Sequence, residues 1–164
     1  MRTIKFIFPL AICILISLQG CRKGNVWGIT GKGNNVTETR DANGYDKIEL
    51  KTDADVLYAQ DSTYYIEVNG QKNILDVLDT KIDGSTLIID LRKNVWKHHK
   101  ITVIVHSPQI NSLSISGSGD IKVQNNLNTT NMNLNISGSG NISVPSLVAQ
   151  TFDGHISGSG NVTV

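Results

Sequence analysis

The fold is decided by a stretch that is written three times: Leu113-Ser-Ile-Ser-Gly-Ser-Gly-Asp-Ile-Lys-Val123, Leu134-Asn-Ile-Ser-Gly-Ser-Gly-Asn-Ile-Ser-Val144 and His155-Ile-Ser-Gly-Ser-Gly-Asn-Val-Thr-Val164. The isoleucine before each Ser-Gly-Ser-Gly recurs at 115, 136 and 156, so the intervals are 21 and 20 residues. A fixed period of this length is typical of stacked repeats, in which each unit buries its apolar face only against its neighbours.

Each unit is predicted to hold two β-strands, because apolar residues alternate with polar ones on both sides of the Ser-Gly-Ser-Gly. The glycines allow positive φ and close approach of backbones, so the chain can bend sharply between the strands. The bend is either a hairpin turn, with the halves antiparallel, or a corner, with each half parallel to its counterpart one unit away. We favour the corner, because the tightest hairpins use two-residue turns such as Asn-Gly. A corner would stack equivalent positions about 4.8 Å apart and place Asp120, Asn141 and Asn161 in one ladder.

The chain upstream of the repeat also has β character, punctuated by predicted turns at Asn43-Gly44, Asn69-Gly70 and Asp83-Gly84. The strands predicted there are residues 47–50, 55–58, 64–68, 77–82, 86–91 and 101–105, and residues 73–79 form at most one helical turn. We therefore predict an all-β fold, built as a parallel β-helix-like solenoid with turns of about 20 residues. The alternative is an antiparallel β-sandwich of hairpins.

The N-terminus has the pattern of an export signal. Arg2 and Lys5 precede an apolar run of 13 residues, from Phe6 to Leu18, which is too short to span a bilayer. The run ends at Leu18-Gln19-Gly20-Cys21, which resembles the lipobox of bacterial lipoproteins. That resemblance implies cleavage before Cys21 and acylation of its thiol and amine. Labelled palmitate supplied to cells would then be incorporated at Cys21. We divide the chain into a signal peptide (1–20), a lipid-anchored tether (21–29) and one β domain (30–164).

Charge and cysteine content agree with a lipid-anchored protein of the cell envelope. Lys and Arg number 15 against 14 Asp and Glu, so the chain lacks the basic excess that a nucleic-acid backbone requires. Cleavage would leave Cys21 as the single cysteine, which excludes an intramolecular disulfide and leaves acylation to explain the thiol. Arg22 and Lys23 follow the cysteine in place of an acidic run, which favours the periplasmic side of the outer membrane over the cell surface.

The repeats, together with Gly31-Lys-Gly-Asn-Asn-Val36, Gly44-Tyr-Asp-Lys-Ile48 and His106-Ser-Pro108, resemble the head GIN domain family, also called the putative auto-transporter adhesin family. The resemblance runs from about residue 30 to the end. It implies an exported, often lipid-anchored bacterial protein with a right-handed parallel β-helix-like fold. The adhesin label is a family title, and the residues do not by themselves specify an activity.

No catalytic or metal-binding constellation is predicted. His98 and His99 lie between lysines without neighbouring carboxylates, and we expect them, with His106 and His155, to be ordinary strand-end residues. A polysaccharide lyase would need several acids and a basic stripe on one face. The repeats offer one acid and two amides in the ladder, and Lys122 is replaced by Ser143 and Thr163. We therefore expect no enzyme, no metal and no cofactor.

Aromatic side chains are the remaining groups able to anchor a partner, and we expect most of them to pack in the interior. They are Trp27, Tyr58, Tyr64, Tyr65 and Trp96. The leading functional hypothesis is a non-enzymatic, lipid-anchored envelope protein, a binding, adhesive or structural module with a glycan or protein ligand. The alternatives are a lyase-like carbohydrate-active enzyme and an accessory protein of envelope sensing. The membrane is the one partner that the sequence specifies, through acyl chains on Cys21; the oligomeric state is left open.

Overall fold

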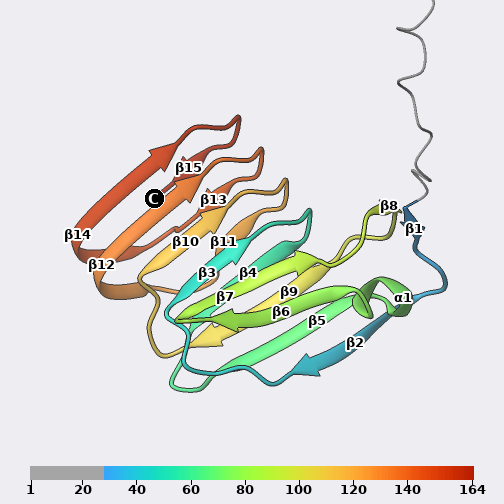
Figure 1. Ribbon diagram of the computed structural model, residues 1–164. Coiled ribbons are helices and arrows are strands. Elements are labelled where there is room, and N and C mark those ends of the chain that lie inside the picture. The colour runs from blue at the N-terminus through green and yellow to red at the C-terminus, as the bar shows by residue number, and fades with distance from the viewer. Residues whose placement is uncertain (1–27) are drawn as a thin grey trace, which may run out of the picture.

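The computed structural model describes residues 28–164, and its all-β fold confirms the predicted class (Figure 1). Among these residues the one helix is α1 (Lys72–Leu75), and none is long and apolar enough to cross a membrane. The strands are β1 (Ile29–Thr30), β2 (Asn35–Arg40), β3 (Lys47–Leu50), β4 (Asp55–Gln60), β5 (Tyr65–Gln71), β6 (Leu78–Asp83), β7 (Thr86–Leu91), β8 (Val95–Lys97), β9 (Thr102–Ser107), β10 (Ser112–Ile115), β11 (Ile121–Val123), β12 (Leu127–Ile136), β13 (Ile142–Ser143), β14 (Leu147–Ile156) and β15 (Val162–Thr163).

Two large sheets lie face to face (Figure 1). One has the strand order β14-β12-β10-β3-β7-β6 and the other β15-β13-β11-β4-β9-β5-β2, while β1 and β8 form a small separate pair. Alternate residues of the strands are buried, as in β9, where Val103, Val105 and Ser107 are buried and their neighbours are half-buried. Because both sheets turn their apolar residues inward, one hydrophobic core fills the space between them.

The three repeat units stack in parallel, with Ile115 beside Ile136 and Ile136 beside Ile156. The first half of each unit lies in the six-stranded sheet and the second half in the seven-stranded sheet, so the Ser-Gly-Ser-Gly is a corner between sheets. The hairpin geometry that the sequence left open is not found in residues 112–164. We call each strand–corner–strand unit a rung.

A further rung comes from an upstream segment that lacks the Ser-Gly-Ser-Gly. β3 and β4 pair in parallel with β10 and β11, with Leu50 beside Ile115 and Val56 beside Ile121. This first rung is followed by β10–β11, β12–β13 and β14–β15 as the second, third and fourth. On its other side the first rung pairs with β7 and β9. The chain therefore leaves the first rung, builds the far side of both sheets, and returns to lay down the second rung.

The whole domain is not a parallel solenoid. β2 pairs antiparallel with β5, β5 with β9, and β6 with β7, so both large sheets are mixed, and neither closes on itself. The two facing layers fit the alternative prediction, a β-sandwich, better than a continuous β-helix. The antiparallel pairing is confined to the part of the chain upstream of the repeat, where the sequence loses its strict period.

The corner glycines are needed for close approach and not for positive φ. Within residues 28–164, positive φ is found at Gly33, Gly44 and Gly84 only, so that part of the prediction was wrong. A Cβ on Gly140 would lie 2.8 Å from the Gly119 carbonyl carbon and closer still to its oxygen. Real side chains do not come so near a carbonyl, and the same crowding recurs in every corner of the repeat. Glycine therefore allows the corners to stack.

The predicted ladder of polar side chains is confirmed. Asp120 Oδ1 accepts hydrogen bonds from the backbone N and the side-chain Nδ2 of Asn141, at 2.8 and 2.9 Å. Asn141 Oδ1 accepts the equivalent pair from Asn161, at 3.1 and 3.3 Å. These bonds tie neighbouring corners together in the direction of stacking.

One local prediction was wrong. Asn69-Gly70 is not a turn but lies inside β5, where a Cβ on Gly70 would come within 3.0 Å of Leu75 Cδ2; this glycine leaves room for the α1 side chain. The segments 124–133 and 145–154, which link successive rungs, are largely strand, because β12 and β14 each extend over 10 residues. Pro145 precedes β14 and lies outside its backbone pairing.

Candidate functional site

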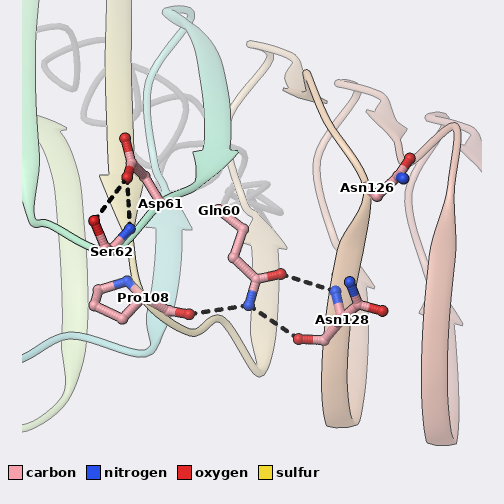
Figure 2. A pocket seen from close by; sticks show the side chains of 6 residues that line it. All are labelled: Gln60, Asp61, Ser62, Pro108, Asn126 and Asn128. Carbon is pink, nitrogen blue, oxygen red and sulfur yellow. Dashed lines mark hydrogen bonds between the residues drawn. The ribbon is translucent and has the colours of Figure 1, made fainter.

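An open hollow of about 370 Å³ lies where strands of both sheets end and the connections between them begin (Figure 2). Gln60 ends β4, Asp61 and Ser62 follow it, and Pro108 follows β9. Asn126 and Asn128 come from the turn that leads into β12 and from its second residue. The lining is Gln60, Asp61, Ser62, Pro108, Asn126 and Asn128. All but the proline offer polar side chains.

Gln60 forms the fixed floor of the hollow. Its Nε2 donates to the carbonyl oxygens of Pro108, at 2.9 Å, and Asn128, at 3.0 Å, while its Oε1 accepts from the Asn128 backbone N at 2.8 Å. Asn125 bonds the Gln60 backbone on both sides, through its Oδ1 and its Nδ2. The amide of Gln60 is thus fully used in holding the first rung, the third rung and the β9 end together.

Asp61 presents one carboxylate oxygen inward and one outward. Oδ1 accepts from the Ser62 backbone N at 2.5 Å and from its hydroxyl at 3.2 Å (Figure 2). Oδ2 lies 3.6 Å from Nδ1 of His106, at the border of the hollow. The side-chain amides of Asn126 and Asn128 make no hydrogen bond to any residue within 28–164. These groups are available to a polar ligand.

Aromatic rings extend the hollow on the side of β5 and β9. The rings of Tyr65 and His106 lie 5.5 Å apart, and Tyr65 is 36% exposed. The Tyr65 hydroxyl donates to Glu67 at 2.7 Å, and this hydrogen bond raises the pKa of Tyr65. We name the combined area, formed by Asp61, Ser62, Tyr65, His106, Asn126 and Asn128, the Asp61 surface. It combines the hydroxyl, amide and carboxylate groups of the hollow with two rings that adjoin it through the Asp61–His106 contact.

Two buried tyrosines support the Asp61 surface from below. The Tyr45 hydroxyl donates to the carbonyl oxygen of His106 at 2.7 Å, and the ring of Tyr45 packs edge-on against Tyr64. The Tyr58 hydroxyl lies 3.0 Å from the Ser107 hydroxyl oxygen. Burial raises the pKa of Tyr58 to about 12 and that of Tyr45 further, so both stay neutral at physiological pH. Their hydrogen bonds fix the end of β9 beneath the surface.

The histidines do not form a metal site. No group of three or more His, Cys, Asp or Glu residues converges within the described part of the chain. His98 is nevertheless not a solvated residue: its side chain is 11% exposed, and its Nε2 lies 3.0 Å from a carboxylate oxygen of Asp53. His98 does lie at the end of β8, as expected, but it is not solvated there, because the chain upstream brings an acid to it.

The structure separates the sequence-predicted anchoring groups. Tyr58 is fully buried, Tyr64 and Tyr65 are partly exposed, and Trp96 is 75% exposed. Trp27 and the proposed acylation site Cys21 lie outside the described residues. The sequence analysis missed Gln60, Asn126 and Asn128; alternation marks the ends of their strands, but only the fold brings those ends together.

Solved structures with the same fold are known from Bacteroides and Parabacteroides species. A "putative adhesin" from Bacteroides fragilis is 26% identical, with a TM-score of 0.77, covering 82% of this chain and 64% of that one. A "putative adhesin" from Parabacteroides merdae is 20% identical with the same TM-score of 0.77, covering 82% of this chain and 57% of that one. A "Putative lipid binding protein" from Parabacteroides distasonis is 26% identical, with a TM-score of 0.69, covering 82% and 59%. This chain thus spans less than two thirds of each of these proteins.

No curated protein matches the chain. The family described as "Putative auto-transporter adhesin, head GIN domain" matches residues 44–164, which include all four rungs and the Asp61 surface. The matching family and the structures compared above are named for adhesion or lipid binding, and none is named as an enzyme. The resemblance to this family that the repeats showed is confirmed, and the chain belongs to the head GIN domain family.

Proposed function

We propose that this protein is a lipid-anchored, non-enzymatic binding module of the bacterial cell envelope, and that the Asp61 surface holds a glycan. The observation that carries the proposal is the Asp61 surface itself. The unengaged amides of Asn126 and Asn128 line the hollow with Asp61, which contacts His106, and the His106 ring lies against the exposed Tyr65. Amide and hydroxyl groups donate to and accept from sugar hydroxyls, and aromatic rings are enriched where proteins bind partners. Of the two 26% identical structures, one is named a "putative adhesin" and the other a "Putative lipid binding protein", and both names agree with a binding role.

The fold supports a binding role because it makes a rigid platform. Three glycine corners and the ladder from Asp120 to Asn161 lock the second, third and fourth rungs together as a short parallel solenoid. Asp120, the acid that a lyase would need at the repeat, accepts two hydrogen bonds from Asn141. Its carboxylate therefore has a structural task, which counts against the carbohydrate-active enzyme.

The anchor remains a proposal from the sequence. A signal peptide of residues 1–20, acylation at Cys21 and a tether to residue 29 would place the domain at the outer membrane, on its periplasmic side or at the cell surface. The first described strand, β1, begins at Ile29, beside the proposed end of the tether. Cells fed labelled palmitate should yield labelled protein, and the Cys21→Ser variant should carry none. Equal labelling of the parent and the Cys21→Ser variant would refute acylation at Cys21.

Glycan-array binding tests the ligand class. Asn128→Ala and Tyr65→Ala should each weaken binding several-fold, since losing one hydrogen bond costs about 1 kcal/mol, or roughly fivefold in affinity. Gln150→Ala, which removes an exposed amide of β14 that does not line the hollow, is the matched control and should bind as the parent does. If no glycan binds, or if binding is unchanged in both surface variants, the Asp61 surface is not a glycan site.

A further inference from the structure

Trp96 on β8 is the most exposed large hydrophobic side chain among residues 28–164, at 75%. An indole held in water is costly, and tryptophan is enriched where proteins meet the headgroup region of membranes. The Asp61 surface does not use this residue. Its exposure therefore calls for a partner elsewhere on the molecule.

The segment that carries Trp96 is held firmly by its neighbours. Ile29 N donates to the Asn94 carbonyl at 2.8 Å and Gly31 N to the Lys97 carbonyl at 2.7 Å, which pairs β1 with β8. His98 contacts Asp53, and the His99 backbone N donates to Gln71 Oε1 at 2.9 Å. Trp96 is thus presented from a segment fixed on both sides.

Positive charge gathers around Trp96. Residues 28–35 and 92–100 contain five lysines and arginines and no aspartate or glutamate. The rest of the described chain has six lysines and arginines against all 14 acids. Lys32, Lys93 and Lys97 take part in no ion pair within the described residues. An anionic surface would therefore attract this end of the domain and repel the remainder.

The tether brings the same end to the bilayer. Six residues separate Cys21 from Gly28, and the seven Cα–Cα steps between them span at most about 25 Å when fully extended. A Cβ on Gly28 would lie 2.8 Å from the Trp96 backbone N, so the entry of the chain into the domain is next to Trp96. An acylated Cys21 would hold β8 within reach of the headgroups.

We propose that the end formed by β1 and β8 docks on the membrane, with Trp96 at the headgroup level and Lys32, Lys93 and Lys97 against anionic phospholipid headgroups. This docking rests on the proposed acylation of Cys21. Docking through β1 and β8 would also orient the Asp61 surface relative to the membrane. β8 lies on the same side of the sheets as the corners (Figure 1), and Lys100 beside it pairs with Asp55 at the start of β4. Gln60 is at the other end of β4, about 17 Å away, so the hollow faces away from the bilayer.

The test uses the intact acylated protein in vesicles of phosphatidylcholine and phosphatidylglycerol, with or without bromine on the acyl chains. In Trp27→Phe protein, Trp96 is the sole tryptophan, and brominated lipid should quench its emission by about half or more, as for an indole at the headgroups. Lys93→Glu with Lys97→Glu should reduce that quenching. The matched control, Trp27→Phe/Trp96→Phe/Tyr65→Trp, reports from the Asp61 surface and should not be quenched.

The outcomes separate docking from anchoring. Mass spectrometry of the same preparation shows whether Cys21 is acylated; protein without acyl chains would refute the anchor. Acylated protein with equal Trp96 emission in both kinds of vesicle would refute docking and leave the anchor standing. Quenching at position 65 equal to that at position 96 would refute the orientation.

Discussion

Replacing Gly140 with alanine tests whether the corners stack as closely as described. The new Cβ would lie 2.8 Å from the Gly119 carbonyl carbon, nearer to its oxygen, and 3.2 Å from Ile115 Cγ2. The backbone of the second rung cannot move away freely, because Gly119 N donates to the Thr52 carbonyl oxygen of the first rung at 3.1 Å. The third rung must therefore shift outward at its corner.

That shift has a cost that can be worked from the contacts. It strains the bonds from Ser137 N to the Ile115 carbonyl, 2.8 Å, and from Ser139 N to the Gly117 carbonyl, 3.0 Å. Two backbone hydrogen bonds contribute about 1 kcal/mol each, and overpacking a dense interior costs about 1–3 kcal/mol. The lower entropy of the unfolded alanine chain returns about 0.4–1 kcal/mol. The net loss should be about 3 kcal/mol.

Urea unfolding, followed by far-ultraviolet circular dichroism on Cys21→Ser protein, measures this loss. With a slope of about 2 kcal/mol/M, the midpoint should fall by about 1.5 M. Gly154→Ala is the matched control, because its Cβ would meet only the Phe152 ring, at 3.4 Å, an ordinary contact. If Gly140→Ala unfolds at the same urea concentration as Gly154→Ala, the corners do not stack as closely as stated.

Three further predictions concern the core, the tyrosines and the β8 segment. Met132, which is 2% exposed, lies beside Phe152 of the next rung, which is 52% exposed. In thermal unfolding, Met132→Ala should lower the free energy of unfolding by about 2–5 kcal/mol, and Phe152→Ala should lower it clearly less. Equal losses in the two variants would contradict the exposed outer face of the fourth rung. Burial raises the pKa of Tyr58 to about 12, so this phenol ionises at a lower pH in the unfolded chain than in the folded one. The free energy of unfolding should therefore fall as the pH rises from about 10 towards 12. The urea midpoint should decline less over this range in Tyr58→Phe than in the parent, and parallel declines would show that burial of the Tyr58 hydroxyl does not cause the pH dependence. His98→Ala removes the contact with Asp53 and should speed tryptic cleavage at Lys93, Lys97 and Lys100 in and beside β8. An unchanged digestion rate would mean that the backbone pairing alone holds this segment.

Much of the architecture could be predicted from local pattern. The strands at 47–50 and 86–91 have the predicted limits, and the ladder of Asp120, Asn141 and Asn161 follows from their identical place in each unit. The first rung escaped notice because its corner contains Thr52 and Ala54, not glycines. On the side away from the second rung, the first rung faces β7 and β9, which are joined by the longer segment 92–101. No corner of the same shape lies against the corner of the first rung on that side, so side chains are tolerated at Thr52 and Ala54.

The Asp61 surface could not be predicted, because it depends on contacts between distant parts of the chain. Gln60 reaches Pro108 and Asn128, 48 and 68 residues away, and no local pattern marks such a meeting. The resemblance to a family supplied a fold and a general role but no site.

The sequence alone determined the all-β class and the period of the repeat, since these follow from alternation and spacing. It favoured parallel stacking through glycine corners but left the hairpin open. Only the tertiary structure decided that the sheets are mixed, that the first rung lies between β9 and β11, and that Trp96 faces solvent beside the entry of the chain. The physical reason is the separation in sequence between the residues that interact. A sequence period reveals the contact between one repeat unit and the next. The pairing of Lys47 with Ser112, 65 residues apart, depends instead on which strand edges are still unpaired once the other strands have assembled.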